Sequence, residues 1–128
     1  SMLVPIVCVG ESLAERQSGK ALQVIERQLS AVIDHCGVER LARAVVAYEP
    51  LWAVGTGVTA APEQAQEVHA HIRGMLGSVG MLTRIVYGGS VKAGNAKALF
   101  AQPDIDGALV GAASLIAKEF LDICQAAE

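Results

Sequence analysis

The residues best suited to chemistry lie in the stretch AYEPLWAVGTG, residues 47–57, where a carboxylate follows an apolar run. Glu49 is the only carboxylate that directly ends the apolar segment 44–48. A carboxylate at the end of a buried strand loses part of its hydration, which favours its use as a base that removes a proton from carbon. The same position also suits a glutamate that caps a helix or forms a salt bridge, and Glu49 taken alone favours that plainer interpretation.

The segment after this glutamate has the pattern of a hinged lid. Pro50 makes the exit from the strand rigid, because its ring fixes one backbone dihedral and restricts the residue before it. Gly55, Thr56 and Gly57 leave the far end of the segment free to change conformation. Trp52, between the two ends, offers a large apolar surface that could exclude water from a site, although it could equally be a core aromatic.

Two later apolar segments end in small residues that could bind an anion. They are followed by GGS at residues 88–90 and by GAAS at residues 111–114. Backbone N–H groups in such turns, close to a following helix, can bind phosphate without a lysine or arginine. Each turn by itself is equally well explained as a tight turn, but two adjacent strands that end this way favour a phosphate site.

The remaining candidates favour structural roles. Tyr87 ends an apolar segment and suits packing better than chemistry. Cys8 lies inside an apolar strand with no histidine nearby, so we expect a buried structural thiol. His69 and His71 are two residues apart and cannot face the same way on a helix, so we expect them, with His35, at the surface.

These residues must be positioned by alternating strands and helices. Short apolar segments typical of buried parallel strands occupy residues 3–9, 44–48, 84–87 and 107–110. Helical periodicity fills the intervals at residues 20–36, 62–76, 95–101 and 117–126. The pattern predicts an α/β fold of four parallel strand–helix units, either half of an eight-stranded (β/α)8 barrel or a small doubly wound sheet. In both, a site lies at the carboxyl ends of the strands.

Composition limits the class of protein. The chain has 128 residues, 52% of them hydrophobic, and a net charge of −3, which suits one domain over residues 1–128. No apolar run reaches the roughly 18 residues of a membrane span, and the scattered basic residues give no support to nucleic-acid or membrane binding. Three cysteines without CxxC spacing, and no signal peptide, indicate a cytoplasmic protein with reduced thiols and no zinc site.

The stretch AYEPLWAVGTG resembles the active-site signature of the triosephosphate isomerase family, a family of TIM-barrel enzymes. The resemblance extends over nearly the whole chain in family order. PIVCVGESLAERQSGK resembles the family's fifth strand and following helix, and APEQAQEVHAHIR the helix after the lid. RIVYGGSV and DIDGALVGAASL resemble the seventh and eighth strands. The resemblance therefore implies the C-terminal half of the barrel, with the N-terminal half absent.

The resemblance implies a proton-transfer role for Glu49. It would be the base that interconverts dihydroxyacetone phosphate and glyceraldehyde 3-phosphate in glycolysis and gluconeogenesis, with no cofactor and no metal. The segment from Pro50 to Gly57, which includes Thr56, would be the lid, and Glu11 would meet the indole of Trp52 when the lid closes.

The resemblance also implies which residues hold the substrate. The phosphate would be bound by backbone N–H groups of Gly55, Ser90, Gly111 and Ala112. Tyr87 and Ser90 would hold the closed lid, and Cys8 would support the site near Glu49.

Local departures from the family pattern concern two alanines. Ala112 stands where the family usually has a glycine, so this turn would be strained if it required a positive φ. Ala61 stands where the family often has threonine, which would leave the following helix without its N-cap, a loss of about 1 kcal/mol.

The larger departure is the absent first half. The resemblance implies that this half carries a lysine that favours the anionic substrate, a histidine that polarises the carbonyl, a neighbouring glutamate and the loop that forms the dimer. Without an electrophile, a lone base removes a carbon-bound proton slowly. We therefore expect the chain by itself to be an inactive fragment of the enzyme.

Half of a barrel leaves two strand edges and its inner face open. We expect these surfaces to be covered by a second copy, giving a homo-oligomer, or by the N-terminal half. A non-catalytic phosphate-binding or self-assembling scaffold remains the alternative to an enzyme fragment. A different phosphate-handling barrel enzyme is a weaker one.

Overall fold

The computed structural model describes residues 2–128 and contains one parallel β-sheet with helices against it. The strands are β1 (Ile6–Val9), β2 (Val45–Tyr48), β3 (Arg84–Tyr87) and β4 (Gly107–Ala108). The helices are α1 (Leu13–Gln17), α2 (Ala21–Cys36), α3 (Val38–Leu41), α4 (Pro62–Met75), α5 (Ala93–Phe100) and α6 (Ala117–Ala126), with 3₁₀ helices η1 (Gly77–Leu82) and η2 (Ala112–Leu115). The predicted alternation of strands and helices is confirmed.

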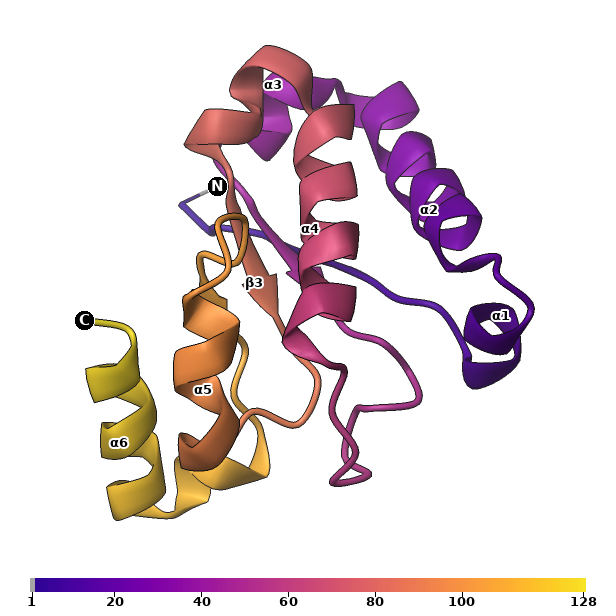
Figure 1. Cartoon of the computed structure of the whole chain (residues 1–128). Helices are drawn as coiled ribbons and strands as arrows, with labels where there is room; N and C mark the ends of the chain where they lie inside the picture. The colour runs from indigo at the N-terminus through magenta and orange to yellow at the C-terminus, as the bar shows by residue number, and fades with distance from the viewer. Residues whose placement is uncertain (1) are drawn as a thin grey trace.

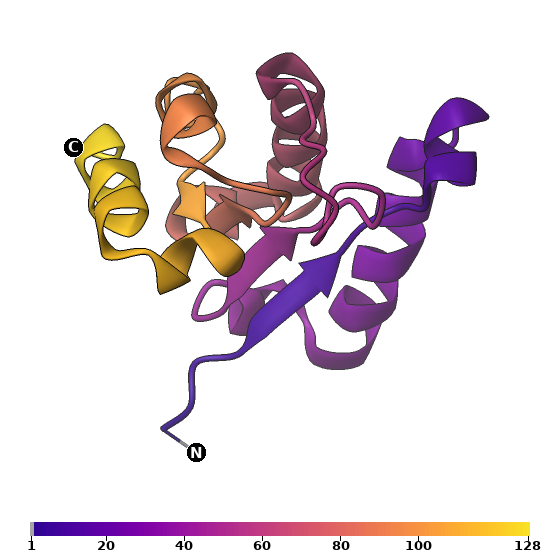
Figure 2. The same cartoon turned by 90° about the horizontal axis from the view of Figure 1, so that it is seen from below.

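The strand order distinguishes the two predicted architectures. The strands lie in the order β1-β2-β3-β4, and every neighbouring pair is parallel. Figures 1 and 2 show the helices in an arc along one side of the sheet, with the other side uncovered. A doubly wound sheet reverses its strand order and carries helices on both faces, so this chain has the architecture of half a barrel.

Several boundaries differ from those predicted. The first strand begins at Ile6 rather than at residue 3, and residues 2–5 are exposed. β4 has two residues rather than four and pairs only with β3. The short helix α1 was not predicted. It is held by a capping box in which Ser12 accepts from Glu15 N–H and Glu15 accepts from Ser12 N–H.

The hydrophobic core lies between the sheet and the helices. Its largest fully buried apolar side chains are Tyr48, Tyr87, Ile25, Leu29, Leu41, Ile72, Leu76, Ile85 and Leu99. The opposite, inner face is apolar but uncovered in this chain, since Ile6 and Cys8 on β1 are exposed. The expectation that the strands are buried on both faces is therefore wrong for β1, and the expectation of a buried Cys8 is wrong for the same reason.

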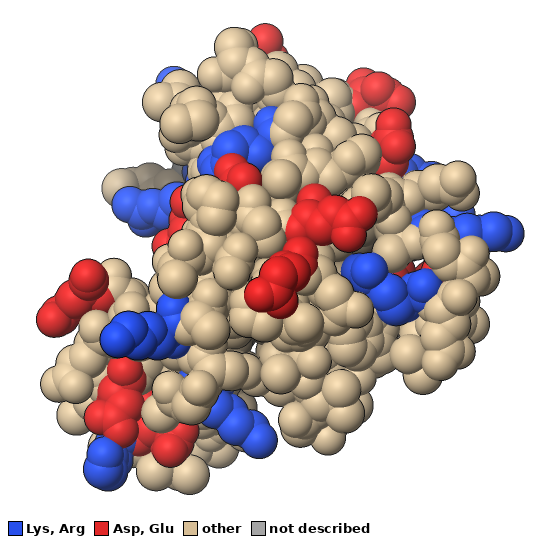
Figure 3. Space-filling model, viewed as in Figure 1, with Lys and Arg blue, Asp and Glu red and all other residues tan. Residues whose placement is uncertain are grey.

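Charge and hydropathy on the surface follow the composition. Figure 3 shows Lys and Arg side chains interspersed with Asp and Glu on the face viewed, without a large patch of one sign. Across residues 2–128, none of the helices combines the length and the apolarity that a bilayer span requires.

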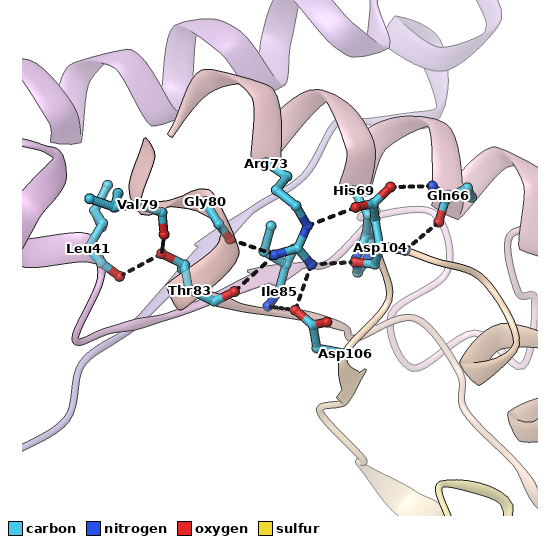
Figure 4. A network of polar contacts seen from close by, with 10 residues as sticks. All are labelled: Leu41, Gln66, His69, Arg73, Val79, Gly80, Thr83, Ile85, Asp104 and Asp106. Atoms are coloured by element: carbon cyan, nitrogen blue, oxygen red, sulfur yellow. Dashed lines mark hydrogen bonds and ion pairs between the residues drawn. The ribbon is translucent and has the colours of Figure 1, made fainter. Parts of the chain in front are cut away.

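At the amino ends of the strands, opposite the glycine-rich turns, a polar network centres on Arg73 of α4 (Figure 4). Its guanidinium donates to the side chains of Asp104 (2.8 Å) and Asp106 (2.7 Å). It also donates to the carbonyls of Gly80 (2.6 Å) and Thr83 (3.2 Å). The network therefore joins α4, η1 and the segments that lead into β3 and β4.

His69 is buried in this part of the molecule, so the expectation that it lies at the surface is wrong. Its ring packs beside those of Tyr48 and Tyr87, with centroids 5.9 and 6.5 Å away. Its Nδ1 lies 3.1 Å from the carbonyl oxygen of Asp104, which can only accept, so Nδ1 carries the proton. Burial lowers the pKa of His69 to about 4.

We expect this buried imidazole to make the folded chain less stable in mild acid. Between pH 6.5 and 4, the unfolded chain protonates His69 and the folded chain does not, so the free energy of unfolding falls as the pH falls, by roughly 2 kcal/mol at pH 5. Urea denaturation at pH 7 and pH 5 measures this loss. His69→Gln keeps a donor for Asp104 but cannot titrate, so it should remove most of the pH dependence. Equal losses in both proteins would contradict the assignment.

Candidate active site

The candidate site lies at the carboxyl edge of the sheet, where backbone hydrogen bonds continue beyond the strands. Glu49 N–H donates to the carbonyl of Val9 (2.8 Å), and Gly88 N–H donates to the carbonyl of Tyr48 (2.8 Å). Glu49 and Gly88 therefore lie side by side, one residue past the ends of β2 and β3. The Glu49 side chain is half-buried rather than free in solvent.

Gly88 makes room for the Glu49 side chain. A Cβ placed on Gly88 would lie 2.5 Å from Cγ of Glu49 and 3.0 Å from its Oε1. Any larger residue at this position would displace the carboxylate, so a glycine is required by close approach rather than only by the turn. The carboxylate thus lies across the end of the neighbouring strand.

Cys8 lies near this carboxylate, on the uncovered inner face of the sheet. Partial desolvation, and then the hydrogen bond and negative charge of Glu49, raise the pKa of the Cys8 thiol. Cys8 is therefore a neutral thiol beside Glu49 rather than a nucleophile, as the sequence indicated, although it is not buried.

An open cleft of about 710 Å³ brings Glu49 together with the residues predicted to bind phosphate. Its lining includes Gly55, Ser90, Gly111 and Ala112, together with Gly57, Lys92 and Leu109. In the part of the chain that the structure describes, the N–H groups of Ser90 and Gly111 donate no hydrogen bond. They are therefore available to an anion in the cleft.

Ser90 has an unusual backbone conformation at this cleft. Its φ of 43° is the only positive value of a non-glycine residue between residues 2 and 128. Such a conformation costs about 1–3 kcal/mol and persists only where its surroundings hold it. The Ser90 hydroxyl donates to the carbonyl of Ala53 in the lid at 2.5 Å, so this residue links the cleft to the lid.

The segment predicted to be a lid runs from Pro50 to Gly57, and its two ends differ in burial and backbone conformation. Pro50 is buried and accepts from Ala53 N–H at 2.9 Å. Gly55 and Gly57 are exposed and have positive φ values of 68° and 78°, which favour glycine. Figure 1 shows this loop projecting away from the helices, between β2 and α4.

Trp52 lies in the middle of this segment and Thr56 near its far end. Trp52 is half-buried against the core, and its Nε1 is buried without a hydrogen-bond partner among residues 2–128. The Thr56 hydroxyl donates to the carbonyl of Trp52 (3.1 Å). Beyond the lid, Tyr87 accepts from Ala60 N–H (2.9 Å) through its buried hydroxyl. Of the two predicted latch residues, Ser90 contacts the segment 50–57 at Ala53, whereas Tyr87 contacts Thr59 and Ala60 just beyond it.

Glu11 is fully buried, but within residues 2–128 the Trp52 indole donates no hydrogen bond to it. Its carboxylate accepts from the Tyr48 hydroxyl (2.7 Å) and from Arg16 Nη2 (2.9 Å). Burial, followed by the hydrogen bond to Glu11 and then its negative charge, raises the pKa of Tyr48, which keeps it a hydrogen-bond donor. Arg16 was not predicted here. A basic residue one turn into the helix after a strand-end carboxylate is the signal that could have indicated it.

The two alanines differ in their effects. Ala112 is the first residue of η2 and has a negative φ, so the strain considered from the sequence does not arise. Ala61 is the N-cap of α4 and offers no side-chain acceptor, as predicted. The Gln64 side chain nevertheless accepts from Ala61 N–H at 3.0 Å, which supplies half of a capping box.

No cluster of three or more His, Cys, Asp or Glu side chains suited to a metal ion occurs within residues 2–128. The chemistry that the cleft itself can offer is a carboxylate base and backbone donors for an anion, beside the segment predicted to be a lid.

Comparison with known proteins agrees with this geometry. A family model described as triosephosphate isomerase matches residues 1–127. The chain is 63% identical over 129 residues to a triosephosphate isomerase of Thiobacillus denitrificans, an alignment that covers 98% of this chain and 52% of the relative. It is 61% identical to one of Pseudomonas paraeruginosa (98% and 51% covered) and 56% identical to one of Pseudomonas entomophila (99% and 52% covered). The chain spans about half the length of the curated relatives it matches.

Proposed function

Because the chain belongs to the triosephosphate isomerase family, we propose that it supplies the base, the lid and the phosphate site of an enzyme that interconverts dihydroxyacetone phosphate and glyceraldehyde 3-phosphate. Its four strand–helix units are half of the family's barrel. The proposal places the reaction in glycolysis and gluconeogenesis, in the cytoplasm.

One observation carries the proposal: Glu49 lines the same cleft as Gly55, Ser90, Gly111 and Ala112. The phosphate of a triose phosphate, bound by the backbone N–H groups, would place a substrate carbon within reach of the carboxylate. Glu49 then takes a proton from one carbon and returns it to the next. Closure of the segment from Pro50 to Gly57, with Trp52 turned inward, excludes water. Triosephosphate isomerase is itself a well-known example of such closure.

The cleft holds the proposed base but few side chains that could polarise the carbonyl of a substrate. Lys92 is the only Lys, Arg or His side chain among the described residues that line the cleft. His69 is buried behind the sheet, and His35 and His71 lie on the outer helices. A carbonyl that is not polarised gives up its neighbouring proton slowly, so we propose that turnover requires groups from outside this chain.

The uncovered surfaces indicate where those groups would come from. Ile6 and Cys8 are exposed on the inner face, and β1 and β4 form the two free edges of the sheet. At the β4 edge, Phe120 and Leu121 of α6 are 40% and 60% exposed. We propose that the rest of the family's barrel, or a second copy of this chain, covers these surfaces. Sedimentation of the chain alone as a uniform monomer would argue against the second copy.

Complementation tests the proposed activity. The chain is assayed for isomerisation alone and after mixing with the first half of the Thiobacillus denitrificans relative. We expect activity only in the mixture. Activity of the chain alone would contradict the requirement for outside groups. An inactive mixture that still binds phosphate would instead favour the non-catalytic phosphate-binding scaffold, which the cleft alone would support.

A further inference from the structure

Asn95 is a polar side chain beside the cleft that neither the base nor the phosphate site uses. It is the third residue of α5 and makes three hydrogen bonds through its amide group. Its Oδ1 accepts from Lys92 N–H (2.8 Å). Its Nδ2 donates to the carbonyl of Ser90 (3.0 Å) and to the hydroxyl of Thr59 (3.3 Å). One amide therefore joins the start of α5, the turn after β3 and Thr59, just beyond the predicted lid.

Two of these points, Ser90 and Thr59, contact the predicted lid or lie just beyond it. Ser90 has the positive φ, and its hydroxyl reaches the lid at Ala53. Thr59 lies just beyond the flexible end of the lid, and its hydroxyl is also 3.2 Å from that of Tyr87. The next residue, Ala60, donates to the same tyrosine hydroxyl. The Asn95 amide thus spans from the turn after β3 to the segment just beyond the glycine end of the predicted lid.

Helix capping alone does not account for an asparagine here. The capping bond uses only Oδ1, which a carboxylate would provide equally well at the third position of a helix. A carboxylate would also interact favourably with the helix dipole, and α5 has no acidic residue in its first turn. The uncharged amide differs from aspartate in its NH₂ group, which is the group that reaches Ser90 and Thr59.

We propose that Asn95 is a positioning residue that couples the far end of the lid to the phosphate turn. Its Nδ2 fixes the carbonyl of Ser90, which holds the strained backbone so that the Ser90 N–H faces the cleft. The same NH₂ group also holds the hydroxyl of Thr59. Backbone rotation during lid closure is then confined to Gly55 and Gly57, which precede Thr59. The phosphate part of this inference rests on the proposed function. The effect on the lid does not.

Asn95→Asp separates the two roles, because it keeps the capping acceptor and removes the NH₂ group. Lys97→Met is the matched control: Lys97 is exposed on the same helix, and its loss lowers the net charge by the same unit. Hydrogen exchange of the ligand-free chain is the first measurement. We expect the Ala60 amide to exchange about tenfold faster in Asn95→Asp than in the control, with the amides of α5 unchanged. Equal exchange at Ala60, or equal acceleration throughout α5, would overturn the proposal.

Titration with inorganic phosphate is the second measurement, followed by the fluorescence of Trp52, the only tryptophan. We expect Asn95→Asp to bind phosphate about tenfold more weakly than Lys97→Met. Equal affinity would overturn the coupling to the phosphate turn. A native chain that gives no phosphate response would count against the proposed phosphate site, whereas the exchange of Ala60 would still decide the role of Asn95 in the lid.

Discussion

Replacing Glu49 with glutamine should lower the kcat of the complemented isomerase by about a thousandfold, with a much smaller change in KM. Glutamine has the size of glutamate and fits over Gly88, where the native side chain lies. It cannot accept a proton from carbon, and general base catalysis contributes roughly 10²–10⁴-fold to rates. The phosphate N–H groups stay in place, so substrate binding should be largely retained. Steady-state assays of the mixture with both triose phosphates measure the two constants.

Glu63→Gln provides the matched control for this substitution. Glu63 is an exposed carboxylate in the first turn of α4, outside the cleft, and the change removes the same charge. It should leave kcat and KM unaltered. A loss of less than about tenfold in Glu49→Gln would show that another group takes the proton, and the assignment of the base would fail.

The position of this glutamate could be predicted because it depends on local order along the chain. A short apolar segment, a carboxylate and a proline place Glu49 at the carboxyl end of a parallel strand, whatever packs around it. The glycine-rich turns after β3 and β4 are local in the same sense. Each strand end that carried a predicted site residue lies at one edge of the sheet, as parallel pairing requires.

Burial could not be predicted in the same way, because it depends on what covers each face. Cys8 lies in an apolar strand, yet no element within residues 2–128 covers its side of the sheet. His69 lies two residues from His71 on one helix, which led to the prediction of a surface position, yet its ring packs beside two tyrosines from β2 and β3. Both predictions failed because a strand or helix pattern gives the direction of a side chain but not its neighbours.

The contacts of side chains between distant segments are the other part that the sequence left open. Arg16 and Asn95 each reach residues more than thirty positions away, Tyr48 and Thr59 respectively. Neither contact has a periodic signal. The capping box at Ser12 was a readable signal for α1, and its omission explains why Arg16 was not placed beside Glu11.

Arg73→Met should have the largest effect on stability and lower the free energy of unfolding by about 3 kcal/mol. The side chain of Arg73 is only 15% exposed and ties α4 to Asp104, Asp106 and two carbonyls at the amino ends of the strands, away from the candidate site at their carboxyl ends. Removing one partner of a largely buried ion pair typically costs 3–5 kcal/mol, because the carboxylates are left without their counter-charge. The partial exposure of Asp106 favours the lower end.

Urea denaturation at pH 7 measures this loss, with Arg40→Met as the control because Arg40 is exposed on α3.

The network around Arg73 also predicts the effect of a second substitution, at Asp106. Asp106 accepts from Ile85 N–H at 2.9 Å as well as from Arg73, so Asp106→Asn keeps an acceptor at the start of β3 and removes a charge that Arg73→Met leaves unpaired. The double variant should therefore be less destabilised than the sum of the two single variants. Strict additivity would show that the two side chains stabilise the fold independently, through packing rather than through their ion pair.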